Sequence, residues 1–192
     1  MYISTQNFHS MTLKELLHQF KDQPITYSQY LSVDEWTKKA DEITKRDNLC
    51  CTVCGKAETV SIPDAKSGKV NHGWFEDGEI AYYGEGRFSI DPKVAFADKH
   101  YHLEVHHKKY IRNRLPWEYS NEDLVTLCNH CHTEFHQNNK VPVYSEDELT
   151  KLDYEVCHRC NGYGYLPEYR HVQGGVCFKC KGERYLQPLI KR

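Results

Sequence analysis

The N-terminal part of the chain predicts two amphipathic helices, because its apolar residues recur three or four positions apart. A capping box precedes each run: a Ser or Thr side chain accepts from the backbone three residues on, and a Glu at that position reaches back. The two boxes are Thr12 with Glu15 and Ser32 with Glu35, and the apolar positions are Leu13, Leu16, Leu17, Phe20, Trp36, Ala40 and Ile43. We expect these faces to pack as ordinary core.

A second pattern predicts a hairpin followed by a helix in the middle of the chain. The segments Leu103 to Lys109 and Leu124 to Leu127 have the composition of strands, with a long loop through Pro116 between them. A helix is expected from His132 to about Asn138. Together with the N-terminal helices, this arrangement predicts an α+β fold.

The segments on either side of the hairpin are less regular. Residues 61–101 are rich in Gly and aromatic side chains, which predicts strands and loops inserted ahead of the hairpin. Residues 139–148 are polar and carry Pro142, which predicts a linker before a short helix near Asp147 to Leu152.

Cysteine is the most informative part of the composition. Eight of the nine cysteines form four Cys-x-x-Cys pairs, and only Cys50 is left over. This pattern indicates metal binding rather than a disulfide framework, and no secretory signal is present, so we expect a cytoplasmic protein. No apolar stretch of about eighteen residues is present, so a membrane protein is not expected.

Net charge does little to identify a partner. The chain has 25 Lys plus Arg against 27 Asp plus Glu and a sequence pI near 6.6. It is therefore not a general electrostatic binder of nucleic acid, and any such contact should be local.

One local candidate is the basic run of Lys108, Lys109, Arg112 and Arg114, interleaved with Tyr110. Such a run suits phosphate contacts, although a solvated loop is the ordinary fate of a charge run.

Two sets of metal ligands can be separated by chemistry. Cys51, Cys54, Cys128 and Cys131 have the number and pairing of a closed tetrahedral zinc site, which would stabilise the fold. Histidines form the other set. His132 and His136 would share one helix face, and adjacent strand residues point to opposite faces, so only one of His106 and His107 can join them. Three imidazoles leave coordination positions open for water and a phosphate oxygen.

These motifs resemble the HNH endonucleases, which have the ββα-metal (His-Me finger) fold, in their four-cysteine zinc subtype. The resemblance runs from about Tyr30 to Gln137. The segments that carry it are Tyr30-Leu31-Ser32, Glu35-Trp36, Arg46-Asp47, Cys51-Thr52-Val53-Cys54-Gly55, Leu103-Glu104-Val105-His106-His107, Pro116-Trp117-Glu118-Tyr119, Asp123-Leu124-Val125-Thr126-Leu127-Cys128 and Cys131-His132.

The resemblance implies a role for each histidine. His106, His132 and His136 would hold one catalytic divalent metal, which could be Mg, Mn, Ni or Zn, and His107 would be the general base that deprotonates water. Asp123 stands where the family has an Asn that orients the base. A carboxylate there can accept a hydrogen bond from the imidazole, whereas the plainer interpretation is that Asp123 caps a turn.

The C-terminal part of the chain carries a second zinc signature. Cys157, Cys160, Gly162 and Gly164 form a full Cys-x-x-Cys-x-Gly-x-Gly, and Cys177, Cys180 and Gly182 repeat it with Arg184 in place of the last Gly. The pattern resembles half of the cysteine-rich domain of DnaJ-type chaperones and implies a second structural zinc. Such a module can bind a protein, bind nucleic acid or only stabilise the tail.

The sequence thus predicts an N-terminal helical segment (1–29), a nuclease domain (30–140) with an insertion at about 61–101, and a linker with a small zinc-binding domain (141–192). The leading functional hypothesis is an endonuclease that hydrolyses phosphodiester bonds in DNA. Cutting both strands would favour a homodimer or two successive nicks. The alternatives are a non-catalytic zinc-stabilised nucleic-acid or protein adaptor, and a nuclease effector activated by a protein partner at the zinc tail.

Overall fold

The computed structural model describes residues 11–21, 23–64, 67–76, 79–82, 88–91 and 93–191. Within these ranges the chain is a mixed α+β protein with four α-helices and small sheets, which confirms the predicted fold class at that level. The α-helices are α1 (Leu13–Gln19), α2 (Tyr27–Tyr30), α3 (Asp34–Arg46) and α4 (Asn129–Asn138), and short 3-10 helices are η1 (Pro116–Glu118), η2 (Asn121–Asp123), η3 (Pro167–Tyr169) and η4 (Gln173–Gly175). None of the described helices combines the length and apolar character that a bilayer span requires.

The N-terminal helices form as predicted, but one of the two capping boxes does not. Thr12 and Glu15 cap α1 reciprocally, since Glu15 accepts from the Thr12 backbone at 2.8 Å and the Thr12 hydroxyl accepts from the Glu15 N–H. The Ser32–Glu35 box is wrong, because Val33 is the N-cap of α3. Glu35 instead accepts the Leu13 N–H at 3.1 Å, so its carboxylate caps α1 and joins the two helices.

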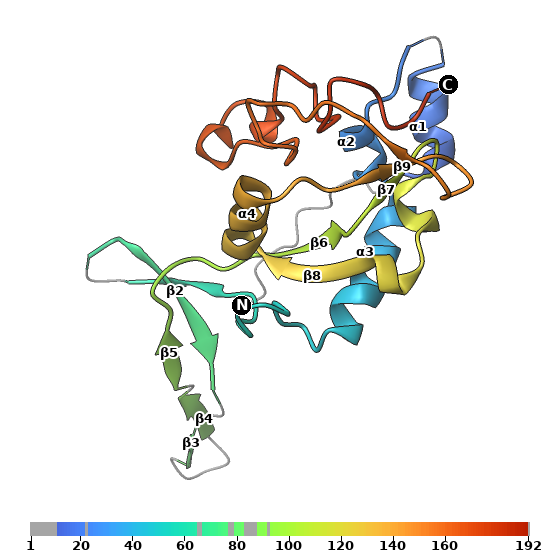
Figure 1. The fold of residues 1–192 in the computed structure, drawn as a ribbon. Coiled ribbons are helices and arrows are strands. Elements are labelled where there is room, and N and C mark those ends of the chain that lie inside the picture. Colours follow the sequence, from blue (N-terminus) through green and yellow to red (C-terminus); the bar gives the residue numbers. More distant parts are fainter. Residues whose placement is uncertain are drawn as a thin grey trace.

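The centre of the fold is an antiparallel pair of strands that leads directly into a helix. Strand β6 (Leu103–His107) pairs with β8 (Leu124–Cys128), with His106 opposite Val125. Helix α4 begins at the residue after β8, and α3 packs against both strands. Figure 1 shows this hairpin and helix at the middle of the molecule. The predicted strand–strand–helix order is therefore present.

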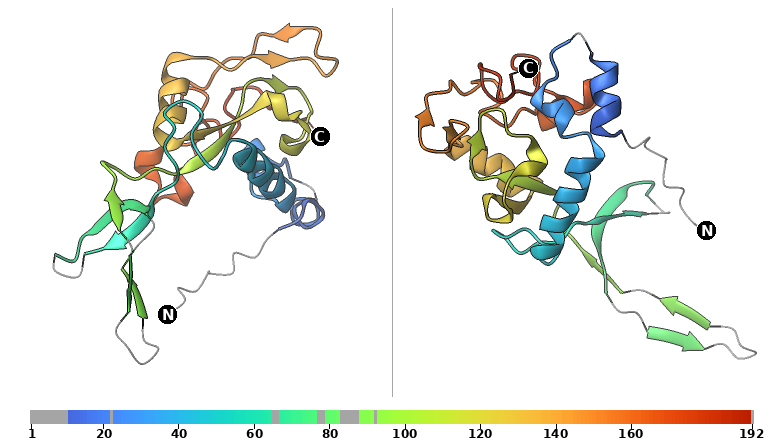
Figure 2. Two further views of the ribbon diagram at one scale, coloured as in Figure 1. Left: turned by 90° about the horizontal axis from the view of Figure 1, so that it is seen from below. Right: turned by 90° about the vertical axis from the view of Figure 1, so that its right-hand side faces the viewer.

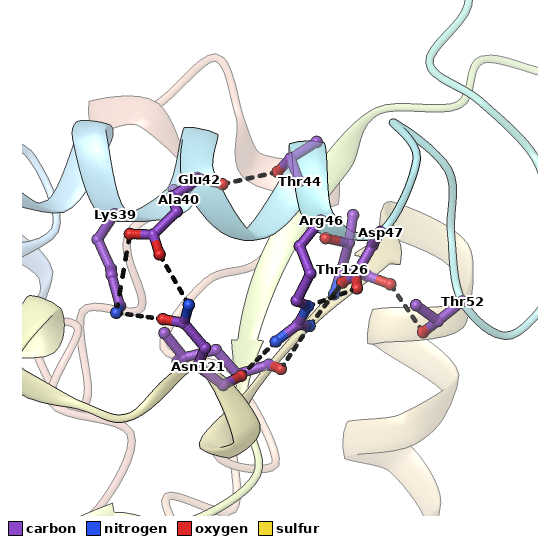
Figure 3. Close-up of polar contacts among 10 residues, drawn as sticks. Lys39, Ala40, Glu42, Thr44, Arg46, Asp47, Thr52, Asn121 and Thr126 are labelled. Carbon is purple, nitrogen blue, oxygen red and sulfur yellow. Dashed lines mark hydrogen bonds and ion pairs between the residues drawn. The ribbon is translucent and has the colours of Figure 1, made fainter.

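A polar network fixes the end of α3 to β8 (Figure 3). Asp47 accepts the Thr126 N–H at 2.9 Å and pairs with Arg46, whose Nη2 donates to the Leu124 carbonyl at 3.0 Å. One turn earlier in α3, Glu42 accepts a hydrogen bond of 2.7 Å from the side chain of Asn121 in η2. These contacts hold α3 along the hairpin, on the side toward which His107 points.

The predicted insertion is a projecting arm of strands. Strands β1 (Val60–Pro63), β2 (Val70–Phe75) and β5 (Val94–Phe96) form an antiparallel sheet in the order β1-β2-β5. Strands β3 (Glu79–Tyr82) and β4 (Phe88–Asp91) form a further hairpin, and both views of Figure 2 show it extending away from the body. Gly73 is required in β2, because a Cβ there would lie 2.4 Å from the Ala95 carbonyl oxygen.

The predicted short helix near Asp147 to Leu152 is wrong. Strand β9 (Val143–Tyr144) pairs antiparallel with β10 (Lys151–Leu152) and parallel with β7 (Tyr110–Ile111), giving a small sheet in the order β10-β9-β7. Asp147 accepts both the Ser145 hydroxyl and the Leu149 N–H, and this local turn replaces the first turn of a helix.

The C-terminal tail packs into the main core rather than standing apart as a separate domain. Tyr185, Leu189 and Ile190 are buried in the same cluster as Leu16 and Tyr27 near the other end of the chain. The Tyr185 hydroxyl donates to the Val141 carbonyl at 2.6 Å. In Figure 1 the tail, orange to red, runs back over α4 toward α1 and α2.

Candidate metal centre

The first four-cysteine cluster joins a turn after α3 to the start of α4. Cys51 and Cys54 lie in the turn, Cys128 ends β8, and Cys131 is in the first turn of α4. Zn–S bonds of about 2.3 Å at tetrahedral angles place sulfurs about 3.8 Å apart, and the Cys54 and Cys128 sulfurs are 3.7 Å apart. Burial would raise the pKa of Cys51, but backbone N–H groups in the cluster lower it to about 7. Thus this group could hold zinc, and Cys50 lies outside it.

The second four-cysteine cluster is local to the tail and fully buried. Its members are Cys157, Cys160, Cys177 and Cys180. The sulfurs of Cys157 and Cys177 are 3.9 Å apart and those of Cys160 and Cys180 are 3.7 Å apart, again close to tetrahedral zinc spacing. The Cys160 thiol, by hydrogen bonding, lowers the pKa of Cys180 to about 5, which favours the thiolate that a metal requires. This group could hold a second zinc.

Three histidines converge at the junction of β6 and α4. His106 Nδ1 lies 3.0 Å from His132 Nε2, and His136 Nε2 lies 3.1 Å from the same atom. Metal–nitrogen bonds of 2.0–2.1 Å give separations from about 2.9 Å at right angles to about 3.3 Å at the tetrahedral angle, and both distances fall in that range. All three rings are buried.

The electrostatics of this triad favour a bound cation. Burial, and then repulsion from His132, lower the pKa of His136 to about 3, and the pKa of His106 is lowered further by the same causes. The imidazoles of His106 and His136 are therefore neutral at pH 7, with lone pairs available to a metal. The triad could bind a metal ion and leaves part of its coordination sphere to other ligands.

Glu104 supports the triad, and the sequence analysis did not single it out. His132 Nδ1 donates to Glu104 Oε2 at 2.5 Å, which leaves Nε2 as the ligand atom. The Tyr163 hydroxyl donates to the same oxygen at 2.6 Å. Burial alone would raise the pKa of Glu104, but these two hydrogen bonds hold it below its usual value. A signal was present: Glu104 lies two residues before His106 and therefore on the same face of the strand.

His107 points away from the triad, into an aromatic cluster. Its ring stacks on Trp36 with centroids 5.0 Å apart and meets Tyr119 edge-on at 4.6 Å. Its Nε2 lies 3.1 Å from the Pro116 carbonyl, which can only accept, so Nε2 carries the proton and Nδ1 the lone pair. Burial lowers the pKa of His107 to about 3. The ring is neutral at pH 7, as a general base must be.

The structure places Asp123 against Lys109 rather than against His107. Its Oδ1 lies 3.2 Å from Lys109 Nζ, and its Oδ2 accepts the Ser120 hydroxyl at 3.0 Å. The Pro116 carbonyl makes the contact with His107 that we had expected from Asp123.

The basic run is largely neutralised by nearby carboxylates. Lys109 and Arg114 pair with Glu148 at 2.8 and 2.6 Å, and Arg112 pairs with Glu146 at 3.3 Å. Lys108 is exposed. The acidic partners come from the β9–β10 turn, which the sequence analysis had taken for a linker and helix. The four residues therefore do not form a free cationic surface beside the histidines.

The tail covers one side of the histidine triad. The Tyr163 ring stacks on His136 with centroids 5.2 Å apart and an interplanar angle of 13°, and it contacts His132 at 4.5 Å. Next to this contact, a cavity of about 360 Å³ is lined by residues from both the body and the tail, among them Trp36, Glu104, His132, Tyr163 and Arg184. His132 is the metal-ligand candidate that faces this cavity.

Comparison of the chain with protein-family models, with curated proteins and with solved structures finds no match.

Proposed function

We propose that the protein is a metal-dependent endonuclease of the HNH type that hydrolyses phosphodiester bonds, with DNA as its substrate. The observation that carries this proposal is the convergence of His106, His132 and His136 where an antiparallel hairpin meets a helix, with His107 adjacent in the chain. A site made only to stabilise the fold would have a closed set of four ligands, as both cysteine clusters have.

Each side chain has a chemical role in this proposal. A divalent metal on the triad would supply Lewis-acid stabilisation of the phosphate and of the departing oxygen. Glu104 holds His132 in the tautomer that presents Nε2, whereas the Pro116 carbonyl holds His107 in the tautomer that presents Nδ1. His107 Nδ1 would take the proton of the attacking water.

A second candidate function is a non-catalytic zinc-stabilised adaptor, and one observation favours it. The His107 side chain is only 3% exposed, between the aromatic rings of Trp36 and Tyr119. As a general base His107 needs a water at Nδ1 when substrate is bound, whereas as a core residue it needs none.

Cleavage assays separate the two functions. Supercoiled plasmid, single-stranded DNA and RNA are incubated with the full chain after weakly bound metal has been removed and Mg, Mn, Ni or Zn restored. The wild type should nick or linearise the plasmid. His107→Gln, which keeps an amide within reach of the Pro116 carbonyl, should cut about 10²–10⁴-fold more slowly with its metals retained. His171→Ala, at an exposed histidine of the tail, is the control.

Two outcomes would contradict the proposal. Absence of cleavage by folded, metal-loaded wild type on every substrate would leave the adaptor. Wild-type rates in His107→Gln would show that a different group removes the proton.

A further inference from the structure

The two halves of the tail motif differ at one backbone position. Gly164 closes the first half with φ +77°, and Arg184 occupies the same place in the second half with φ +73°. This left-handed region suits glycine and is unfavourable for a residue with a Cβ. An arginine held in a conformation that its counterpart satisfies with glycine indicates that the side chain is required there.

The Arg184 side chain points from the tail toward the body. Its guanidinium carbon lies 4.8 Å from the ring centroid of Tyr27 and 5.9 Å from that of Tyr110. One nitrogen donates to the Gly182 carbonyl at 3.1 Å. Among the described residues no Asp or Glu forms an ion pair with it, unlike Arg112 and Arg114 in the basic run. The guanidinium is oriented by aromatic rings, and the acidic groups Cys180 and Glu183 act on it without a salt bridge.

Arg184 shares a cavity with the candidate metal site. The lining of the 360 Å³ cavity includes His132, Glu104 and Arg184, and Arg184 is the only Lys or Arg among its described lining residues. The Glu104 carboxylate is already engaged by His132 and Tyr163. With a divalent metal on the triad, the cavity would have positive charge from both the metal and Arg184, which suits an anion.

We propose that Arg184 binds the phosphate group of the substrate beside the metal, so that the zinc-bound tail is part of the active site. A planar guanidinium can donate two parallel hydrogen bonds to two oxygens of one phosphate group. The second zinc would then act by holding Arg184 rigidly in the cavity that His132 also lines. This inference rests on the proposed function for its substrate, but it makes a claim about phosphate binding that stands without cleavage.

A plainer role for Arg184 is to fasten the tail to Tyr27 and Tyr110 through cation–π contacts. That role predicts loss of stability on substitution and no effect on phosphate. The two roles therefore differ in a direct binding measurement.

The test measures binding of inorganic phosphate to the full chain with Mn²⁺ at the histidines. Thiolate clusters retain Zn²⁺ under these conditions because sulfur ligands favour it. Relaxation of the ³¹P signal reports phosphate close to Mn²⁺. Arg184→Gly introduces the residue that the first half of the motif has at this position. Arg184→Lys keeps the positive charge but removes the planar guanidinium. The control is Arg159→Gln, at an exposed arginine of the tail.

We expect wild type and Arg159→Gln to bind phosphate alike, and Arg184→Gly to bind at least about tenfold more weakly with its zinc content and melting temperature maintained. If Arg184→Gly loses its zinc, the test passes to Arg184→Lys, which must bind phosphate more weakly than wild type while it stays folded. Unchanged phosphate binding in a folded Arg184 variant, or no binding by Mn-loaded wild type, would overturn the inference. Phosphate binding through Arg184 without any DNA cleavage would uphold it and remove the proposed nuclease.

Discussion

The two four-cysteine clusters have the same chemistry but connect the chain in different ways. The first joins segments far apart, since Cys54 and Cys128 are separated by 74 positions, and its Cys54 is exposed. The second closes a short loop, since Cys157 and Cys177 are 20 positions apart, and all four of its cysteines are buried. A metal in the first cluster would therefore fix the topology of the body, whereas a metal in the second would shape one local module.

The two clusters also contact different parts of the histidine site. Cys131 is adjacent to His132 in α4, so the first cluster positions the metal-ligand candidates. The second cluster positions Tyr163, which packs on the ligands, and Arg184, which lines the cavity in front of them. A zinc in the first cluster would hold the histidine ligands in place, and a zinc in the second would hold Tyr163 and Arg184.

Removal of the first zinc should have the larger effect. Cys128→Ser takes away a ligand at the end of β8, where the β6–β8 pair, α4 and the turn of Cys51 meet. We expect the loss of at least about 5 kcal/mol, comparable with the whole stability of a domain, because zinc binding and folding are coupled. Circular dichroism melts and metal analysis should show loss of both this zinc and the histidine-bound metal.

The matched control for that variant is Cys50→Ser, which changes the adjacent cysteine outside the cluster. It should melt like the wild type. A Cys128→Ser protein that keeps wild-type stability and its histidine metal would mean that the two sites are independent.

Removal of the second zinc should have a smaller and more local effect. Cys177→Ser should loosen the tail around Tyr163 and Arg184 at a cost of roughly 3 kcal/mol, the burial of one or two large side chains. Hydrogen exchange should rise in 157–184, while β6, β8 and α4 stay protected and the histidine metal is retained. Loss of protection in the β6–β8 hairpin would show instead that the tail is as essential to the body as the first cluster.

Features set by local spacing could be predicted from the sequence. Each Cys-x-x-Cys pair, and the pair of His132 and His136, lies together as its spacing suggests, because turn and helix geometry determine which side chains are neighbours. The capping box at Thr12 forms for the same reason.

Features set by distant contacts could not be predicted in this way. Glu35 caps another helix, while its expected partner Ser32 donates to the Gln29 carbonyl. Asp123 meets Lys109, which also pairs with Glu148 from the β9–β10 turn. Likewise the Gly-to-Arg difference at position 184 was visible, but the place of Arg184 in a cavity shared with His132 depends on how the tail packs. Tertiary contacts overrode the local patterns at these residues.

The central claim is that His106, His132 and His136 hold a metal distinct from the two cysteine-bound zinc ions. Native mass spectrometry of the full chain, with elemental analysis, tests it most directly. We predict three metal ions per wild-type chain and two in His136→Ala, with both zinc ions retained, matching the three ligand groups. Two zinc ions in the wild type, with none added by any divalent metal and no change in His136→Ala, would contradict the account.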